Sequence, residues 1–182
     1  MFDPTLLAGG TVAAYISTGR MPKAPADVPA EWCRPGAAFV CIKKNGDLRG
    51  CVGTYMPTRD SLVEEIMHNA VSSALNDTRF LPVRIDELPG LEFSVDVLES
   101  PQQVKTADEL DPRVFGVMVR SGPRLGLLLP NLEGVDRVDK QIAIAKQKAG
   151  IAAGEDIELF RFKVRRFEPA GTAGELFSLD DG

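Results

Sequence analysis

The chain has 182 residues, of which 44% are hydrophobic, and a formal net charge of -5 at pH 7. This length is enough to bury roughly 70% of the unfolded surface, so we expect an ordinary globular protein. The sequence contains no apolar run of about eighteen residues and no basic segment ahead of an apolar core at its start. We therefore expect a cytoplasmic protein without a membrane partner, and the acidic balance makes a nucleic-acid partner unlikely.

The first predicted elements are a helix over residues 5–18 and a proline-rich connection over residues 19–36. A β-hairpin follows, with strands Ala37 to Lys44 and Asp47 to Thr54. Asn45-Gly46 between them is typical of a tight turn that needs positive φ at both central residues.

A regular two-residue turn fixes which residues face each other in this hairpin. It pairs Val40 with Cys51, and strand alternation then places Arg49 and Cys51 on one face. Cys41 and Cys51 are expected on opposite faces, so the pattern predicts that they form no disulfide. With Cys33, the cysteines number three at wide spacing, which favours a reducing compartment.

Cys51 is the sharpest catalytic candidate, with Arg49 beside it. A guanidinium near a thiol favours the thiolate, so Cys51 could act as a nucleophile while Arg49 stabilises negative charge. A general base would have to be a carboxylate from elsewhere, such as Glu92 or Asp77. The other interpretation is that Cys51 is a small buried hydrophobic residue.

Gly50 and Gly53 flank Cys51 and have two explanations. Either the backbone needs an unusual φ or a bulge there, which is the commoner case, or something approaches the main chain closely. Exposed strand amides together with Arg49 could also receive a small anion.

A strong helix signal comes next, with Ser61 as a possible cap and an apolar stripe between residues 63 and 74. Helical spacing places His68 on the polar face, near Glu64 and Glu65. The loop after this helix carries Asp77, Arg79 and Phe80, which are further candidate site residues. Locally, Asp77 could simply hold the loop and pair with Arg79.

In the second half of the sequence, alternating apolar residues predict a half-buried strand around residues 92–97 and a second hairpin of Gly116 to Arg120 and Leu125 to Leu129. A helix from Arg137 to Ala149, capped by Asp136, is expected after this hairpin. The last strand, about residues 157–167, changes its apolar phase, which suggests a bulge. Residues 168–182 are expected to form a mobile tail. These elements predict an α+β fold, with a largely antiparallel sheet flanked by helices.

Metal and cofactor sites are not predicted. His68 is the only histidine, and the sequence has no Cys-x-x-Cys pair or cysteine cluster for an iron-sulfur centre. The basic residues of the last strand, Arg161, Lys163 and Arg165, alternate with aromatic ones, so the two kinds should lie on opposite faces. That arrangement does not favour stacking on nucleic-acid bases.

Several of these segments carry a resemblance to a known family. The LRGCVGT stretch (48–54) resembles the hallmark motif of the AMMECR domain family, whose prokaryotic members are called AmmeMemoRadiSam system protein A. The likeness continues through PTRDSLVEEI (57–66), residues 77–82, LGLLLPNLEGVD (125–136) and ELFRFKV (158–164). It covers about residues 5–167, so residues 1–182 are interpreted as a single domain of this type.

The resemblance implies two unequal lobes with a cleft between them and the motif hairpin near that cleft. The residues expected to line it are Arg49, Gly50, Cys51, Gly53, Thr54, Asp77, Arg79 and Phe80. The family name implies an accessory or binding component that works with a Memo-like protein and a radical SAM protein. The alternative is an enzyme that uses Cys51 as nucleophile and Arg49 to stabilise an anion.

Overall fold

The computed structural model describes residues 2–169, which divide into two compact units. The first unit contains residues 2–97 and 166–169, and the second contains Leu98–Arg165. No helix among these residues is long and apolar enough to cross a membrane. The tail expected to be mobile lies outside the described residues from 170 onward.

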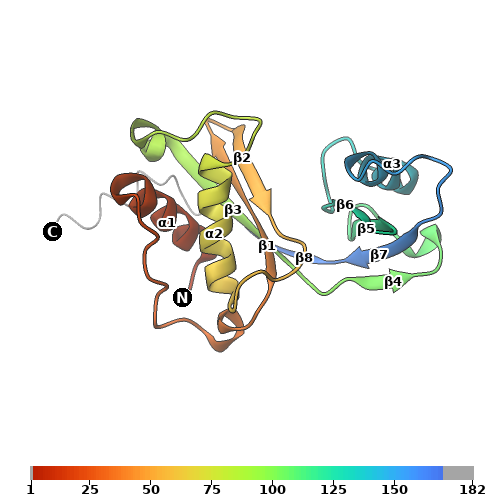
Figure 1. Cartoon of the computed structure of the whole chain (residues 1–182), viewed down its shortest axis with the longest axis horizontal. Helices are drawn as coiled ribbons and strands as arrows, with labels where there is room; N and C mark the ends of the chain where they lie inside the picture. The colour runs from red at the N-terminus through yellow and green to blue at the C-terminus, as the bar shows by residue number, and fades with distance from the viewer. Residues whose placement is uncertain (1, 170–182) are drawn as a thin grey trace. The chain divides into compact units, whose positions relative to one another are not determined.

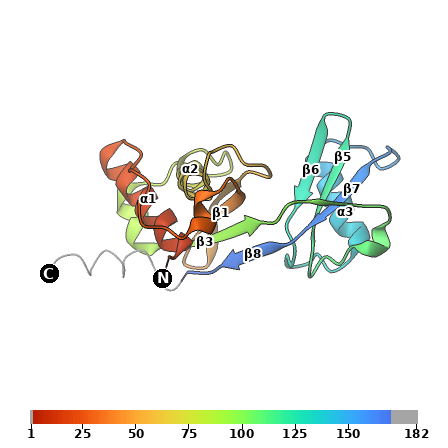
Figure 2. The same ribbon diagram turned by 90° about the horizontal axis from the view of Figure 1, so that it is seen from below.

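Two helices dominate the first unit, where they lie side by side on one face of its sheet (Figure 1; Figure 2). Helix α1 is Pro4–Thr18, capped by the Asp3 carboxylate, which accepts from the Thr5 N–H. Helix α2 is Leu62–Leu75, and the Ser61 hydroxyl accepts from the Glu64 N–H, as the sequence predicted for this cap. A short 3-10 helix, Ala30–Cys33, buries Trp32.

The first sheet has the strand order β2-β1-β3-β8, so β2 lies at an edge. Its strands are β1 (Ala37–Lys44), β2 (Asp47–Gly53), β3 (Leu91–Leu98) and β8 (Val164–Phe167). Val40, Ile42 and Val95 from this sheet pack with Ile66 of α2 in one hydrophobic core. Between α2 and β3 lies the 3-10 helix η2, Ile85–Gly90.

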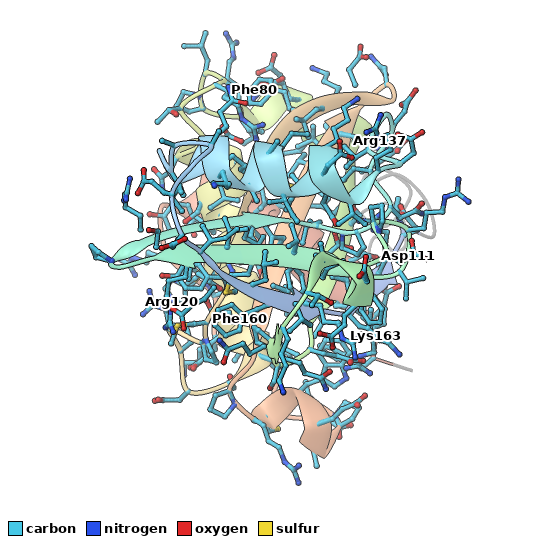
Figure 3. The ribbon with its side chains drawn as sticks, turned by 90° about the vertical axis from the view of Figure 1, so that its right-hand side faces the viewer. Phe80, Asp111, Arg120, Arg137, Phe160 and Lys163 are labelled. Carbon is cyan, nitrogen blue, oxygen red and sulfur yellow. A yellow bond between two sulfur atoms is a disulfide. The ribbon has the colours of Figure 1, made fainter. Side chains whose placement is uncertain are left out.

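The second unit has its own sheet, with the order β4-β7-β5-β6, and its own core. The strands are β4 (Gln102–Val104), β5 (Gly116–Ser121), β6 (Arg124–Leu128) and β7 (Glu158–Phe162). The 3-10 helix η3 (Ala107–Glu109) lies between β4 and β5. Helix α3, Val138–Lys148, packs on β5 and β6 (Figure 3). A Cβ at Gly126 would overlap the Ala145 carbonyl oxygen, so glycine allows this close approach.

The predicted α+β fold is confirmed, with antiparallel four-stranded sheets and flanking helices. Two details differ from the sequence predictions. Helix α3 begins after Arg137, and no side chain caps it, so Asp136 is not its cap. The expected last strand is two strands, because the chain leaves the second sheet after Phe162 and enters the first at Val164. The cleft that the family resemblance implied stays a prediction.

Candidate functional site

The motif hairpin has the predicted turn but a shifted register. Asn45 and Gly46 have φ of 54° and 85°, as a tight hairpin turn requires. Lys43 pairs with Leu48, but Ile42 pairs with Gly50, so the pairing shifts by one residue. Arg49 is therefore the extra residue of a β-bulge.

The bulge brings Cys41 directly opposite Cys51, with their Cα atoms 4.1 Å apart, and the two form a disulfide. The prediction that they lie on opposite faces without a disulfide was wrong, because it assumed a hairpin without a bulge. The inference of a reducing compartment from the cysteine pattern loses that support. Cys33 is free and exposed.

The Arg49 guanidinium is bound within the chain. Its Nη2 and Nε donate to the two carboxylate oxygens of Glu87 at 2.9 and 3.1 Å, and its Nη1 donates to the Leu81 carbonyl at 2.9 Å. Lys44 Nζ also lies 3.1 Å from Glu87. Donation by Arg49 outweighs burial and lowers the pKa of Glu87 to about 2. Arg49 therefore ties β2 to the loop and 3-10 helix that follow α2.

Asp77 and Arg79 bind both backbone polar groups of Cys51. Asp77 Oδ2 accepts from the Cys51 N–H at 2.8 Å, and Arg79 Nη2 donates to the Cys51 carbonyl at 3.2 Å. The pair is itself bidentate, with Arg79 Nε and Nη2 at 2.9 and 2.6 Å from the carboxylate oxygens. The predicted Asp77–Arg79 pairing is confirmed, and Arg79 holds the pKa of Asp77 well below its usual range.

Asp77 is the last of four buried polar residues spaced four apart along and just beyond α2: Glu65, Asn69, Ser73 and Asp77. Each one binds the hairpin or the segment that follows it, and we call them the polar ladder. Asn69 Nδ2 donates to the Ala38 carbonyl at 2.9 Å. The Ser73 hydroxyl accepts from the Val52 N–H at 2.9 Å and donates to the Val40 carbonyl at 2.7 Å.

Glu65 begins the polar ladder and is only 1% exposed, so it does not belong to the polar face of α2. His68 lies near Glu64 and Glu65, as the helical spacing predicted, and is half-buried. Its carboxylate accepts from the hydroxyls of Thr54 and Thr58 and from the N–H groups of Thr58 and Arg59. Burial opposes ionisation, yet these hydrogen bonds outweigh it and lower the pKa of Glu65. Thr54 therefore has a structural role, because its hydroxyl donates a hydrogen bond to the buried Glu65 carboxylate.

Gly50 and Gly53 both allow protein atoms to come close, and neither has a positive φ. A Cβ at Gly50 would overlap the Ser73 carbonyl oxygen, and one at Gly53 would overlap the Phe39 ring. Gly50 also lies next to the bulge, so both explanations apply to it. The strand amides that could have received an anion, those of Cys51 and Val52, donate to the polar ladder instead.

Phe80 is half-buried, and the Arg79 guanidinium lies 5.5 Å from the centre of its ring. The described residues include no group of three or more His, Cys, Asp or Glu side chains that could hold a metal ion. The first unit therefore brings all eight predicted site residues around β2, where most of their polar atoms bind other residues of the chain.

The basic side chains of the last strands also bind within the chain. Arg161 lies over the Phe115 ring at 4.6 Å and donates to the Glu109 carbonyl, while Arg166 forms a bidentate pair with Asp96. Phe162 is buried, and Phe160 lies beside Arg120 (Figure 3). The absence of a nucleic-acid partner stays a prediction.

The second unit contains a groove that no sequence motif indicated. Its volume is about 890 Å³, and apolar residues line most of it, among them Leu110, Val138, Ile142 and Ile151. Lys146 lies in its wall, but the ammonium donates to the Ala153 and Glu155 carbonyls at 2.8 and 3.2 Å. Val138 and Ile142 lie on α3, and the amphipathic pattern of a helix alone does not distinguish a groove wall from a core.

The sequence of this chain matches known proteins over nearly its whole length. The AMMECR1 family model matches residues 6–167, a range that spans both units. A Thermotoga maritima protein is 46% identical over 157 residues, covering 85% of this chain and 90% of its own length. A Clostridium acetobutylicum protein is also 46% identical, over 167 residues, but the match covers 90% of this chain and only 36% of that protein.

A solved structure gives the same result. The crystal structure of an uncharacterised protein from Pyrococcus horikoshii superposes with a TM-score of 0.86 at 29% identity, covering 94% of this chain and 92% of its own. The family match over residues 6–167 and the shared fold agree, and the chain belongs to the AMMECR1 family.

Proposed function

We propose that this protein is a cytoplasmic binding component, which acts as an accessory to a Memo-like protein and a radical SAM protein. The observation that carries the proposal is an exposed apolar surface beside the motif hairpin. Leu81 is 84% exposed, Ile85 61% and Leu48 43%. We call these three residues the hairpin surface.

The Arg49–Glu87 ion pair holds the backbone beside the hairpin surface in place. Arg49 follows Leu48 in β2, donates to the Leu81 carbonyl and is bound by Glu87, which lies two residues after Ile85. The backbone at Leu81 is therefore held in place although its side chain is exposed. Exposed apolar patches mark interaction sites, and a backbone that is already held in place lowers the entropic cost of binding a partner.

The alternative function is an enzyme with Cys51 as nucleophile and Arg49 as anion stabiliser. In the structure Cys51 is bonded to Cys41, and the Arg49 guanidinium already binds Glu87 and Leu81. A small anionic ligand would have to displace the carboxylate of Glu87 or of Asp77. The geometry therefore favours binding of a protein over catalysis.

Titration calorimetry with a purified Memo-like protein and a purified radical SAM protein tests the proposal. We expect one of them to bind, and Leu81→Glu to weaken binding at least tenfold because it places a charge in the contact. Val114→Glu is the matched control, since Val114 is 48% exposed but belongs to the second unit. No heat with either partner, or equal losses in both variants, would reject the proposal.

A further inference from the structure

The Cys41–Cys51 disulfide joins the edge strand of the first sheet to its neighbour. The two cysteines face each other across the β1–β2 ladder, and β2 is the edge strand of its sheet. Both residues are half-buried rather than enclosed in the core. Their disulfide is therefore unlike one sealed in a hydrophobic interior, because thiol–disulfide exchange requires access to a sulfur atom.

The fold does not depend on this bond to bring the two cysteines together. The Asn45-Gly46 turn and the pairing of β1 with β2 already close the hairpin, and the disulfide joins residues only ten positions apart. Asp77 and Arg79 fix the N–H and carbonyl of Cys51 without touching the bond between the sulfur atoms. Because neither contact involves a sulfur atom, we expect both to persist when that bond opens and to keep the two thiols opposite each other.

We propose that Cys41 and Cys51 are a reversible dithiol–disulfide couple, which exchanges with small or protein thiols while the protein stays folded. Asp77 and Arg79 act as positioning residues that keep the effective concentration of the two thiols high. In a reducing compartment, a disulfide is usually catalytic or redox-sensing rather than structural. This inference is independent of the hairpin surface.

The exchange with a dithiol reductant moves two electrons. One thiolate of the reductant attacks a sulfur of the pair, forms a mixed disulfide and releases the other cysteine as a thiolate, which takes up a proton. The second thiolate of the reductant then attacks the reductant sulfur of the mixed disulfide. This step closes the disulfide of the reductant and releases the remaining cysteine, which is also protonated. The reductant becomes a disulfide, and its two protons pass to the cysteines by way of the solvent. Glutathione disulfide reverses the reaction and yields two molecules of glutathione.

Equilibration of the full chain in glutathione buffers of varied ratio tests the proposal. A Cys33→Ser background removes the free exposed cysteine. After acid quenching and alkylation, mass spectrometry counts the thiols, and circular dichroism reports folding. We expect both cysteines to titrate together as one two-electron step while the fold is retained. A disulfide that opens only after urea is added, or thiols that do not pair again in the folded protein, would overturn the proposal.

The positioning residues give a second readout. Asp77→Asn removes a charged acceptor of the Cys51 N–H, and we expect it to lower the effective concentration of the thiols about tenfold. Arg79→Gln should act in the same direction and serves if Asp77→Asn does not fold. Asp86→Asn is the matched control, because Asp86 forms an exposed pair with Arg84. A positioning variant that folds and matches the control would overturn the role of Asp77 and Arg79.

Discussion

Asp77 accepts a hydrogen bond from the backbone N–H of Cys51 at 2.8 Å, although 26 residues separate them in the sequence. This contact ends the polar ladder that runs from Glu65 along α2. The outward-facing amide of an edge strand is thereby paired within the chain, and such pairing protects edges from unwanted strand addition. The motif hairpin owes its geometry to α2 and the loop after it.

The Arg49–Glu87 ion pair should stabilise the fold. Both side chains are only 15% exposed, so Glu87→Gln leaves a largely buried guanidinium without its carboxylate. We expect the free energy of unfolding in urea to fall by about 1 to 3 kcal/mol. Asp86→Asn, in a pair whose side chains are 78% and 64% exposed, should cost less than about 0.5 kcal/mol. Equal costs would contradict this assignment.

The same ion pair should make stability depend on pH. Folding lowers the pKa of Glu87 from 4.5 to about 2. The unfolded chain therefore binds the proton more readily, and the stabilisation is complete above pH 4.5 and is lost as the pH falls toward 2. Urea titrations across that range should show the difference between the wild-type chain and Glu87→Gln shrinking with falling pH. A difference that stays constant would show that the carboxylate does not titrate in this way.

Gly50→Ala should be costly, because the added Cβ would overlap the Ser73 carbonyl oxygen, which belongs to the backbone and has little room to move. We expect a loss of about 2 kcal/mol or more in the free energy of unfolding. Gly10→Ala is a matched control, since Gly10 lies within α1 and a Cβ there meets nothing within 4 Å. That change should stabilise by about 0.5 to 1 kcal/mol. The two substitutions are therefore predicted to have opposite signs.

The disulfide should contribute only a modest part of the stability. A bond across about ten residues restricts the unfolded chain by roughly 2.5 to 3 kcal/mol in the loop-entropy model. Unfolding with and without a phosphine reductant should differ by no more than this amount. The double variant Cys41→Ser with Cys51→Ser should not respond to the reductant. Complete unfolding on reduction would contradict the view that the turn, the strand pairing and the hydrophobic core close the hairpin without the disulfide.

Local patterns in the sequence predicted the hairpin, its turn and the cap of α2, because each depends on residues close in the chain. The bulge at Arg49 could not be predicted in this way. It is stabilised by Glu87, 38 residues away, and by the approach of Ser73 to Gly50. A single shifted residue reverses the face of every later side chain in a strand, which is why the predicted positions of Cys41 and Cys51 were wrong.

The polar ladder did leave a signal in the sequence. Glu65, Asn69 and Ser73 recur every four residues next to apolar Ile66 and the rest of the buried stripe, a spacing that places them on one side of the helix. The burial of these side chains could not be predicted, because it depends on hydrogen bonds to backbone groups of the hairpin, which lies far away in the sequence. The phase change after Leu159, interpreted as a bulge, was misleading: β7 pairs regularly with β5 through Leu159 and Phe160. The chain passes between the two sheets further on, at Lys163.

Amide hydrogen exchange, measured on the protein alone and with a Memo-like or radical SAM partner, tests the central claim most directly. The account predicts that the partner slows exchange in residues 47–51 and 79–87, which carry the hairpin surface, and that Leu81→Glu abolishes this protection. It predicts no change along α3, where the groove of the second unit lies. Protection confined to α3, or none with either partner, would contradict the claim that the motif hairpin and the loop after α2 form a binding surface.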